Sequence, residues 1–131
     1  MHDDSENRQA LASAANDAYY DAFERKDLAT MSSLWLPGEH TVCTHPGWPT
    51  IHGTDEILHS YGGIFNGPQT LQFILTNEVV VAGESMAYVS VDENLVDKHG
   101  STSSTSGLNV FAWVDDRWLM MVHHASPIMT R

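Results

Sequence analysis

The segment Trp118-Leu119-Met120-Met121-Val122-His123-His124-Ala125-Ser126-Pro127 decides how this chain folds. Its first half is an apolar run typical of a buried strand, and its second half carries two histidines and a serine before a proline. Imidazole and hydroxyl groups are costly to bury without a partner. Their place at the end of an apolar strand therefore predicts the mouth or floor of a pocket.

The first half of the chain is predicted to be mainly helical. Apolar residues recur every three to four positions between Ser5 and Arg25, which is typical of a helix with one buried face. Asp27 is suited to cap a short second helix, and Thr54 to cap a third. The expected elements are helices at 5–25, 28–35 and 55–65, with a short strand at 40–44.

The second half is predicted to be a meander of long strands. β-branched and aromatic residues alternate with polar ones between turn residues, which is typical of antiparallel strands. The expected strands are Thr70 to Ala82, Met86 to Asp97, Thr102 to Val114 and Trp118 to Ser126. Four strands of this length should coil, and helices can cover one face of the coiled sheet. We therefore predict an α+β, cone-shaped fold in which three N-terminal helices pack on a strongly curved, mostly antiparallel sheet and leave a cavity between them.

Length and charge narrow the classes of function. With 131 residues and 42% hydrophobic content, the chain is expected to form one domain over residues 1–131, with residues 1–6 as a loose tail. The formal net charge of -11, with six Lys and Arg residues, argues against binding to nucleic acid or to anionic membranes.

The single cysteine, Cys43, cannot form an internal disulfide. No apolar run is long enough to span a membrane, and the N-terminus lacks the features of a signal peptide, so we predict a cytoplasmic protein.

Three motifs give the chain a family resemblance. They are Cys43-Thr44-His45-Pro46-Gly47-Trp48, then Ile51-His52-Gly53 before a helix, and Asp116-Arg117-Trp118 leading to His123-His124-Ala125-Ser126-Pro127. Together with the order of elements, from about Ala10 onward, they resemble the nuclear transport factor 2-like (NTF2-like) superfamily, in particular its SnoaL-like and ketosteroid isomerase-like proteins. The last segment also resembles the association domain of calmodulin-dependent kinase II. The resemblance implies the cone-shaped fold but no single activity, because this superfamily hosts isomerases, cyclases, dehydratases, hydrolases and noncatalytic assembly domains.

Glu93 is the first candidate for catalysis. It shares one face of its strand with a row of apolar residues, namely Ala87, Val89, Val91 and Leu95. A carboxylate on such a face is either desolvated, with a raised pKa suited to proton transfer, or exposed near a fraying strand end.

His124 is the second candidate, as an acid or hydrogen-bond donor. Neighbouring residues on a regular strand point to opposite faces, so His123 and His124 cannot both enter the cavity. The resemblance favours His124, with Ser126 on the same side, and leaves His123 for the other surface. The alternative is that His124 binds backbone at the rim of the sheet or lies in a dimer interface.

Several further residues are candidates for ligand binding. Asn77 and Asn109 each place one polar group on an otherwise apolar strand face, as ligand pockets usually require. A register slip or a β-bulge would turn such residues outward. The remaining candidates are Tyr19 or Tyr61 as orienting groups, Trp35 and Trp48 as lids, and His45 as a pocket residue or as an anchor of the following turn.

Two classes of function follow. The first is a pocket protein that acts on a small, fairly apolar organic molecule by proton transfer, as in isomerisation, dehydration or cyclisation. The second is a noncatalytic ligand-binding or assembly domain. In either class we expect a homodimer through the outer face of the sheet, with an apolar surface from Met86, Tyr88, Val96, Met120 and Val122. We expect no metal, because the histidine and cysteine spacings match no common metal motif. We also expect no cofactor.

Overall fold

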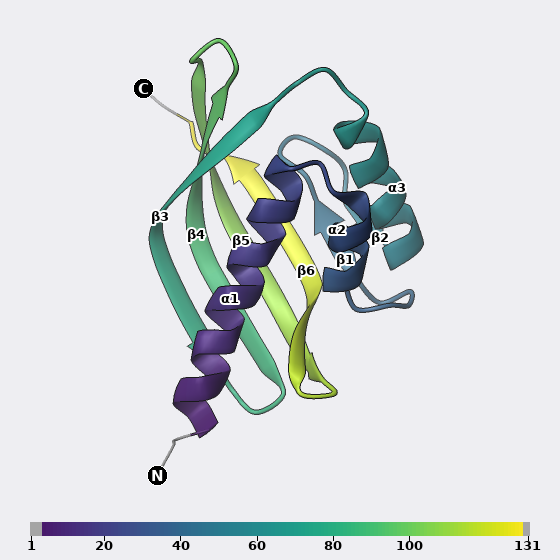
Figure 1. The fold of residues 1–131 in the computed structure, drawn as a ribbon, viewed down its shortest axis with the longest axis vertical. Helices are drawn as coiled ribbons and strands as arrows, with labels where there is room; N and C mark the ends of the chain where they lie inside the picture. Colours follow the sequence, from purple (N-terminus) through teal and green to yellow (C-terminus); the bar gives the residue numbers. More distant parts are fainter. Residues whose placement is uncertain (1–3, 130–131) are drawn as a thin grey trace.

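A single curved sheet, covered on one face by helices, forms the molecule (Figure 1). The computed structural model describes residues 4–129. The strand order is β2-β1-β6-β5-β4-β3, and among the described strands β1 and β6 are parallel while the other neighbours are antiparallel. The strands are β1 (Val42–Thr44), β2 (Ile51–His52), β3 (Leu71–Ala82), β4 (Met86–Asp97), β5 (Thr102–Val114) and β6 (Arg117–Pro127). The predicted α+β fold and its curved, mostly antiparallel sheet are confirmed.

Three helices cover this sheet. Figure 1 shows α1 (Asp4–Glu24) lying across one face of the sheet, with α2 (Leu28–Leu34) and α3 (Thr54–Phe65) gathered beside β1 and β2. The helix α1 begins at Asp4, so residues 4–6 are helical rather than a loose tail, and residues 1–3 lie outside the described part of the chain. None of the helices within residues 4–129 combines the length and the apolar character needed to cross a membrane.

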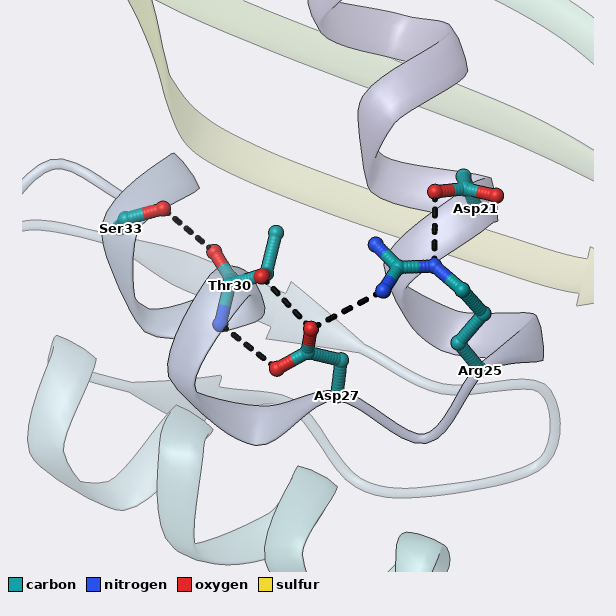
Figure 2. Close-up of polar contacts among 5 residues, drawn as sticks. All are labelled: Asp21, Arg25, Asp27, Thr30 and Ser33. Carbon is teal, nitrogen blue, oxygen red and sulfur yellow. Dashed lines mark hydrogen bonds and ion pairs between the residues drawn. The ribbon is translucent and has the colours of Figure 1, made fainter.

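The turn between α1 and α2 is fixed by a chain of polar contacts (Figure 2). Asp27 caps α2 as predicted, since its carboxylate accepts from the Thr30 backbone N–H at 3.0 Å and from the Thr30 hydroxyl at 2.7 Å. Arg25 donates to Asp27 at 3.1 Å and to Asp21, one helical turn earlier, at 2.9 Å. These contacts join the end of α1 to the first turn of α2.

The start of α3 differs from the prediction. Gly53 occupies the cap position with φ 87°, a left-handed conformation that favours glycine, and it makes no side-chain cap. The Thr54 hydroxyl lies in the first turn of the helix instead. It donates to the Leu36 carbonyl at 2.5 Å and lies 2.7 Å from the Thr41 hydroxyl. Thr54 therefore ties α3 to the preceding loop rather than capping its own helix.

Two β-bulges change which side chains face the helices. In β6, Met120 pairs with Phe111 and Val122 pairs with Val110, so Met121 is an extra residue without a partner in the register. In β3, the register shifts between Thr76 and Val79. Each bulge reverses the inward and outward alternation of the strand beyond it.

Candidate active site

A cavity of about 530 Å³ opens between the helices and the curved sheet. Its walls come from the end of α1, from α3, from the turn after β1, and from strands β3, β4 and β6. Most of the lining is apolar: Phe23, Trp48, Ile64, Phe65, Leu71, Phe73 and Leu95. Polar side chains also reach it, namely Tyr19, Lys26, His45, Gln69, Glu93 and His123. This composition is typical of a site for a small organic molecule.

Glu93 lies in the cavity wall and is 3% exposed. One carboxylate oxygen accepts from the Thr105 hydroxyl at 2.5 Å, and the other accepts from the Tyr20 hydroxyl. Gly107 leaves room for this side chain, because a Cβ at that position would lie 3.0 Å from Oε2. Burial raises the pKa of the Glu93 carboxyl group, and the hydrogen bonds from Thr105 and Tyr20 oppose part of that increase. Glu93 is therefore a stronger base than an exposed carboxylate.

A chain of buried hydrogen bonds connects Glu93 to His123. The Asn109 amide nitrogen donates to the Tyr20 hydroxyl oxygen at 3.0 Å and to Asn16 Oδ1 at 2.8 Å. The Asn109 carbonyl oxygen lies 2.6 Å from Nδ1 of His123. Helix α1 thus contributes Asn16 and Tyr20, and three neighbouring strands contribute the other residues.

The buried His123 is neutral over the physiological pH range. It is 3% exposed, and its ring lies against the Tyr19 ring with the centroids 4.9 Å apart. Burial lowers the pKa of His123 to about 3, with smaller contributions from His45 and His124. With Nδ1 bonded to Asn109, the second ring nitrogen, Nε2, is the one left for the cavity that His123 lines.

His45 is a second neutral imidazole in the lining. Its Nε2 lies 2.8 Å from the Ser60 hydroxyl oxygen, and Ser60 donates its one hydroxyl hydrogen to the Ile57 carbonyl at 2.6 Å. His45 must therefore donate to Ser60 through Nε2. Burial lowers the pKa of His45 to about 4. The ring also packs edge-on against Trp48, with the centroids 4.9 Å apart.

Tyr61 and Cys43 are buried behind this part of the lining, next to Tyr19, which lines the cavity. The Tyr19 and Tyr61 hydroxyls lie 2.5 Å apart, and the Cys43 sulfur lies 3.7 Å from the Tyr61 hydroxyl. Burial raises the pKa of the Cys43 thiol to about 12, so it is not a ready nucleophile. Within residues 4–129, no group of three or more His, Cys, Asp and Glu side chains is arranged to hold a metal ion.

The predicted sides of the two final histidines are wrong. His124 and Ser126 lie exposed on the outer face of β6, whereas His123 is buried in the cavity wall. The bulge at Met121 is the cause. Before the bulge, Trp118 and Met120 face inward; because Met121 is an extra residue, the inward positions after it are His123 and Ala125. Met120 precedes the bulge and pairs with the buried Phe111, so it is fully buried and does not contribute to the outer surface that was predicted for it.

Other predicted ligand-binding residues divide into three groups. Tyr19, His45 and Trp48 line the cavity, and Trp48 is 46% exposed at its edge. Tyr61, Trp35 and Asn109 are buried behind the lining rather than in it. Asn77 is outside the site, since it sits in the β3 bulge with φ 54° and donates to Asp92 on the outer face at 2.7 Å.

Three residues of this candidate site were not predicted from the sequence: Tyr20, Thr105 and His123. Both Tyr19 and Tyr20 are buried, at 1% and 4% exposure, because α1 packs against β3, β4 and β6 of the curved sheet. Thr105 pairs with Glu93 across β4 and β5, so the strand register would have identified it. No sequence signal marks the bulge that selects His123.

Comparison with known proteins places this arrangement in a family. The model of the SnoaL-like domain family matches residues 12–130. A structure from Streptomyces avermitilis, provisionally assigned as a dehydratase of the NTF2-like family, is 34% identical, with a TM-score of 0.89 over 95% of this chain and 99% of that one. A structure from Thiobacillus denitrificans, provisionally assigned as a calcium/calmodulin-dependent protein kinase type II association domain, is 29% identical, with a TM-score of 0.76 over 89% of this chain and 94% of that one.

A curated relative shows the same domain within a longer protein. F-box protein SKIP8 of Arabidopsis thaliana is 26% identical over 116 residues. The match takes in 88% of this chain and 49% of the relative, so this chain spans about half the length of that protein. The family model, the solved structures and the cone-shaped fold agree. The chain belongs to the SnoaL-like domain family of the NTF2-like superfamily.

Proposed function

We propose that the protein binds a small, largely apolar organic molecule and catalyses proton transfer on it, as an isomerase or a dehydratase. One observation carries the proposal: a buried carboxyl group and a neutral imidazole line the same apolar cavity and are joined by hydrogen bonds. Pairs of titratable groups with altered pKa values in a cleft are typical of acid-base sites. The similarity to a provisionally assigned dehydratase supports this class of reaction.

In this proposal Glu93 is the catalytic base. Its carboxylate takes a proton from a carbon atom next to a carbonyl group and then holds that proton in the cavity. In an isomerisation, Glu93 returns the proton to a different carbon. In a dehydration, it gives the proton to the departing hydroxyl group, which leaves as water. The raised pKa of Glu93 suits both steps, because the same group must accept a proton and release it near neutral pH.

His123 replaces His124 as the second functional residue of the proposal. It lines the cavity, whereas His124 lies outside it. With a pKa of about 3, His123 carries no charge at neutral pH and is not an acid. We assign it the task of orienting the ligand through a hydrogen bond at Nε2.

Hydrogen exchange tests the proposal without knowledge of the natural substrate. We expect the wild-type protein to catalyse incorporation of deuterium from D₂O into some members of a panel of small cyclic ketones and β-hydroxyketones. Mass spectrometry of the recovered compounds measures the exchange. Absence of catalysed exchange in every compound that binds, as judged by thermal shift, would favour the noncatalytic ligand-binding alternative.

We also propose that the protein forms a homodimer through the outer face of the sheet. Large apolar side chains gather there, on β3, β4 and β5, and are 40 to 53% exposed: Ile74, Val79, Val81, Met86, Tyr88 and Leu108. A face of this kind is suited to pair with a second copy by a two-fold axis. The similarity to a provisionally assigned kinase association domain supports an assembly role for this fold.

Substitution of one residue on this face tests the dimer. Tyr88→Asp is expected to convert a dimer to a monomer in sedimentation velocity at micromolar concentration, because it buries a charge in an apolar interface. Leu28→Asp is the matched control, since Leu28 is 41% exposed on α2, away from the sheet face. A wild-type monomer, or a Tyr88→Asp dimer as stable as the control, would contradict the proposal.

We propose the cytoplasm as the location of the protein. Its single cysteine, Cys43, is a buried free thiol, which a reducing compartment keeps reduced.

A further inference from the structure

We propose that the cavity selects a neutral ligand whose hydroxyl group donates a hydrogen bond to Nε2 of His123, and that Asn109 is the positioning residue that makes this nitrogen an acceptor. The inference deepens the proposed function and rests on the cavity being a ligand site. It concerns recognition, whereas the proton transfer assigned to Glu93 concerns chemistry. The two are therefore separable by experiment.

The hydrogen bonds of Tyr20 determine the orientation of the Asn109 side-chain amide. Tyr20 donates its single hydroxyl hydrogen to Oε2 of Glu93. The Tyr20 oxygen must then accept from Asn109, which places the amide nitrogen, and not the carbonyl oxygen, towards Tyr20 at 3.0 Å. The carbonyl oxygen of Asn109 is left facing His123.

Asn16 extends the same chain of hydrogen bonds. It is fully buried, and its Oδ1 accepts from the Asn109 amide nitrogen at 2.8 Å. The two hydrogens of the Asn109 amide are thus used by Tyr20 and Asn16, and the Asn109 carbonyl oxygen is the atom that faces His123.

The orientation of Asn109 in turn determines the tautomer of His123. The Asn109 carbonyl oxygen is an acceptor and lies 2.6 Å from Nδ1, so Nδ1 must carry the proton of the neutral ring. Nε2 then holds a lone pair at the cavity. A hydroxyl group can donate to it, whereas a carbonyl or ether oxygen meets it lone pair to lone pair.

The charges around the cavity disfavour an anionic ligand. The buried Glu93 carboxylate lines the site, and both imidazoles in the lining are neutral. Lys26 is the basic residue among the described lining residues, and its ammonium group donates to the Gly67 carbonyl at 2.9 Å. A carboxylate or phosphate ligand would therefore lie near the Glu93 carboxylate, and among the described lining residues Lys26 alone could offset its charge.

Three matched probes test the selectivity: 2-naphthol, its methyl ether 2-methoxynaphthalene, and the anion 2-naphthoate. At pH 7 we expect calorimetry or NMR titration to show 2-naphthol binding about tenfold more tightly than either of the others, as one hydrogen bond to an otherwise unpaired buried group allows. His123→Phe should abolish the preference for the naphthol over the ether. His124→Phe, the same change one residue later on the outer face, should keep it.

The role of Asn109 is tested by the tautomer itself. Long-range ¹H–¹⁵N NMR of the wild-type protein should show the proton of His123 on Nδ1, and Asn109→Leu should shift the population towards Nε2–H and reduce the naphthol preference. A wild-type Nε2–H tautomer, equal binding of naphthol and ether, or failure of all three probes to bind would overturn the inference.

Catalysed exchange that needs Glu93 but shows no hydroxyl preference would overturn this inference alone, and a hydroxyl preference without exchange would overturn the proton-transfer proposal alone. The wild-type tautomer and probe series decide the matter even if a variant fails to fold.

Discussion

Replacement of Glu93 by glutamine is expected to lower the rate of catalysed deuterium exchange by a factor on the order of 10² to 10⁴, the usual contribution of a positioned general base. Glutamine has nearly the same shape but cannot take a proton at neutral pH. Its carbonyl oxygen can still accept one of the two hydroxyl hydrogen bonds that Glu93 receives from Tyr20 and Thr105. Binding of 2-naphthol should therefore change much less than the exchange rate.

Asp92→Asn is the matched control for this substitution. Asp92 is the preceding residue on β4, and its carboxylate accepts a hydrogen bond from Asn77 on the outer face of the sheet. The control removes a negative charge from the same strand without changing the cavity. Retention of exchange within a few-fold by Glu93→Gln, or an equal loss in both variants, would contradict the role of Glu93.

The second large effect is a loss of stability in acid that comes from His123. In the unfolded chain a histidine has a pKa near 6.5, whereas His123 in the folded protein has a pKa of about 3. Between these values the unfolded state binds a proton that the folded state does not, so stability is present above pH 6.5 and is lost as pH falls. Linkage gives a loss of about 3 kcal/mol from His123 alone between pH 7 and pH 4.

Two other buried groups, His45 and Glu93, change the size of this loss of stability in acid, and they act in opposite directions. His45 acts with His123, because its pKa is also lowered, to about 4. Glu93 acts against them, because its raised pKa means that the folded state binds the proton more readily than the unfolded state. We therefore expect a net loss of stability in acid that is smaller than the sum of the two histidines.

Urea unfolding at pH 7 and pH 4 measures the effect. The free energy of unfolding should depend less on pH in His123→Gln than in the wild-type protein. His124→Gln is the control, since His124 is exposed on the outer face, and should change the pH dependence much less than His123→Gln does. A wild-type stability that does not decrease between pH 7 and pH 4, or an equal change in both variants, would contradict the buried neutral state of His123.

The long strands and Glu93 could be predicted because their signals are local. A period of two residues marks the strands, and Glu93 stands out as a charged residue in the apolar row of β4. The side of the sheet that His123 faces was not predictable in this way. Insertion of one unpaired residue, Met121, reverses the alternation without changing the composition of the strand.

The hydrogen-bond chain from Glu93 to His123 could not be predicted from the sequence for another reason. Asn16 and Tyr20 lie 93 and 89 positions from Asn109, and Tyr20 lies 73 positions from Glu93. Their meeting depends on the rotation of α1 about its axis and on the curvature of the sheet. The helical period of the sequence indicates that α1 has a buried face but does not fix which polar residue on that face meets which strand.

The pH dependence of exchange shows whether Glu93 is the buried base of the ligand cavity. We predict that the exchange rate of the wild-type protein rises with pH along a single titration curve, with a pKa above the ordinary value for a glutamate. That pKa should equal the one read for the Glu93 side-chain carboxyl carbon by ¹³C NMR in the same buffer. An exchange rate that stays constant while the Glu93 carboxyl group titrates, or that follows a different pKa, would show that Glu93 is not the base.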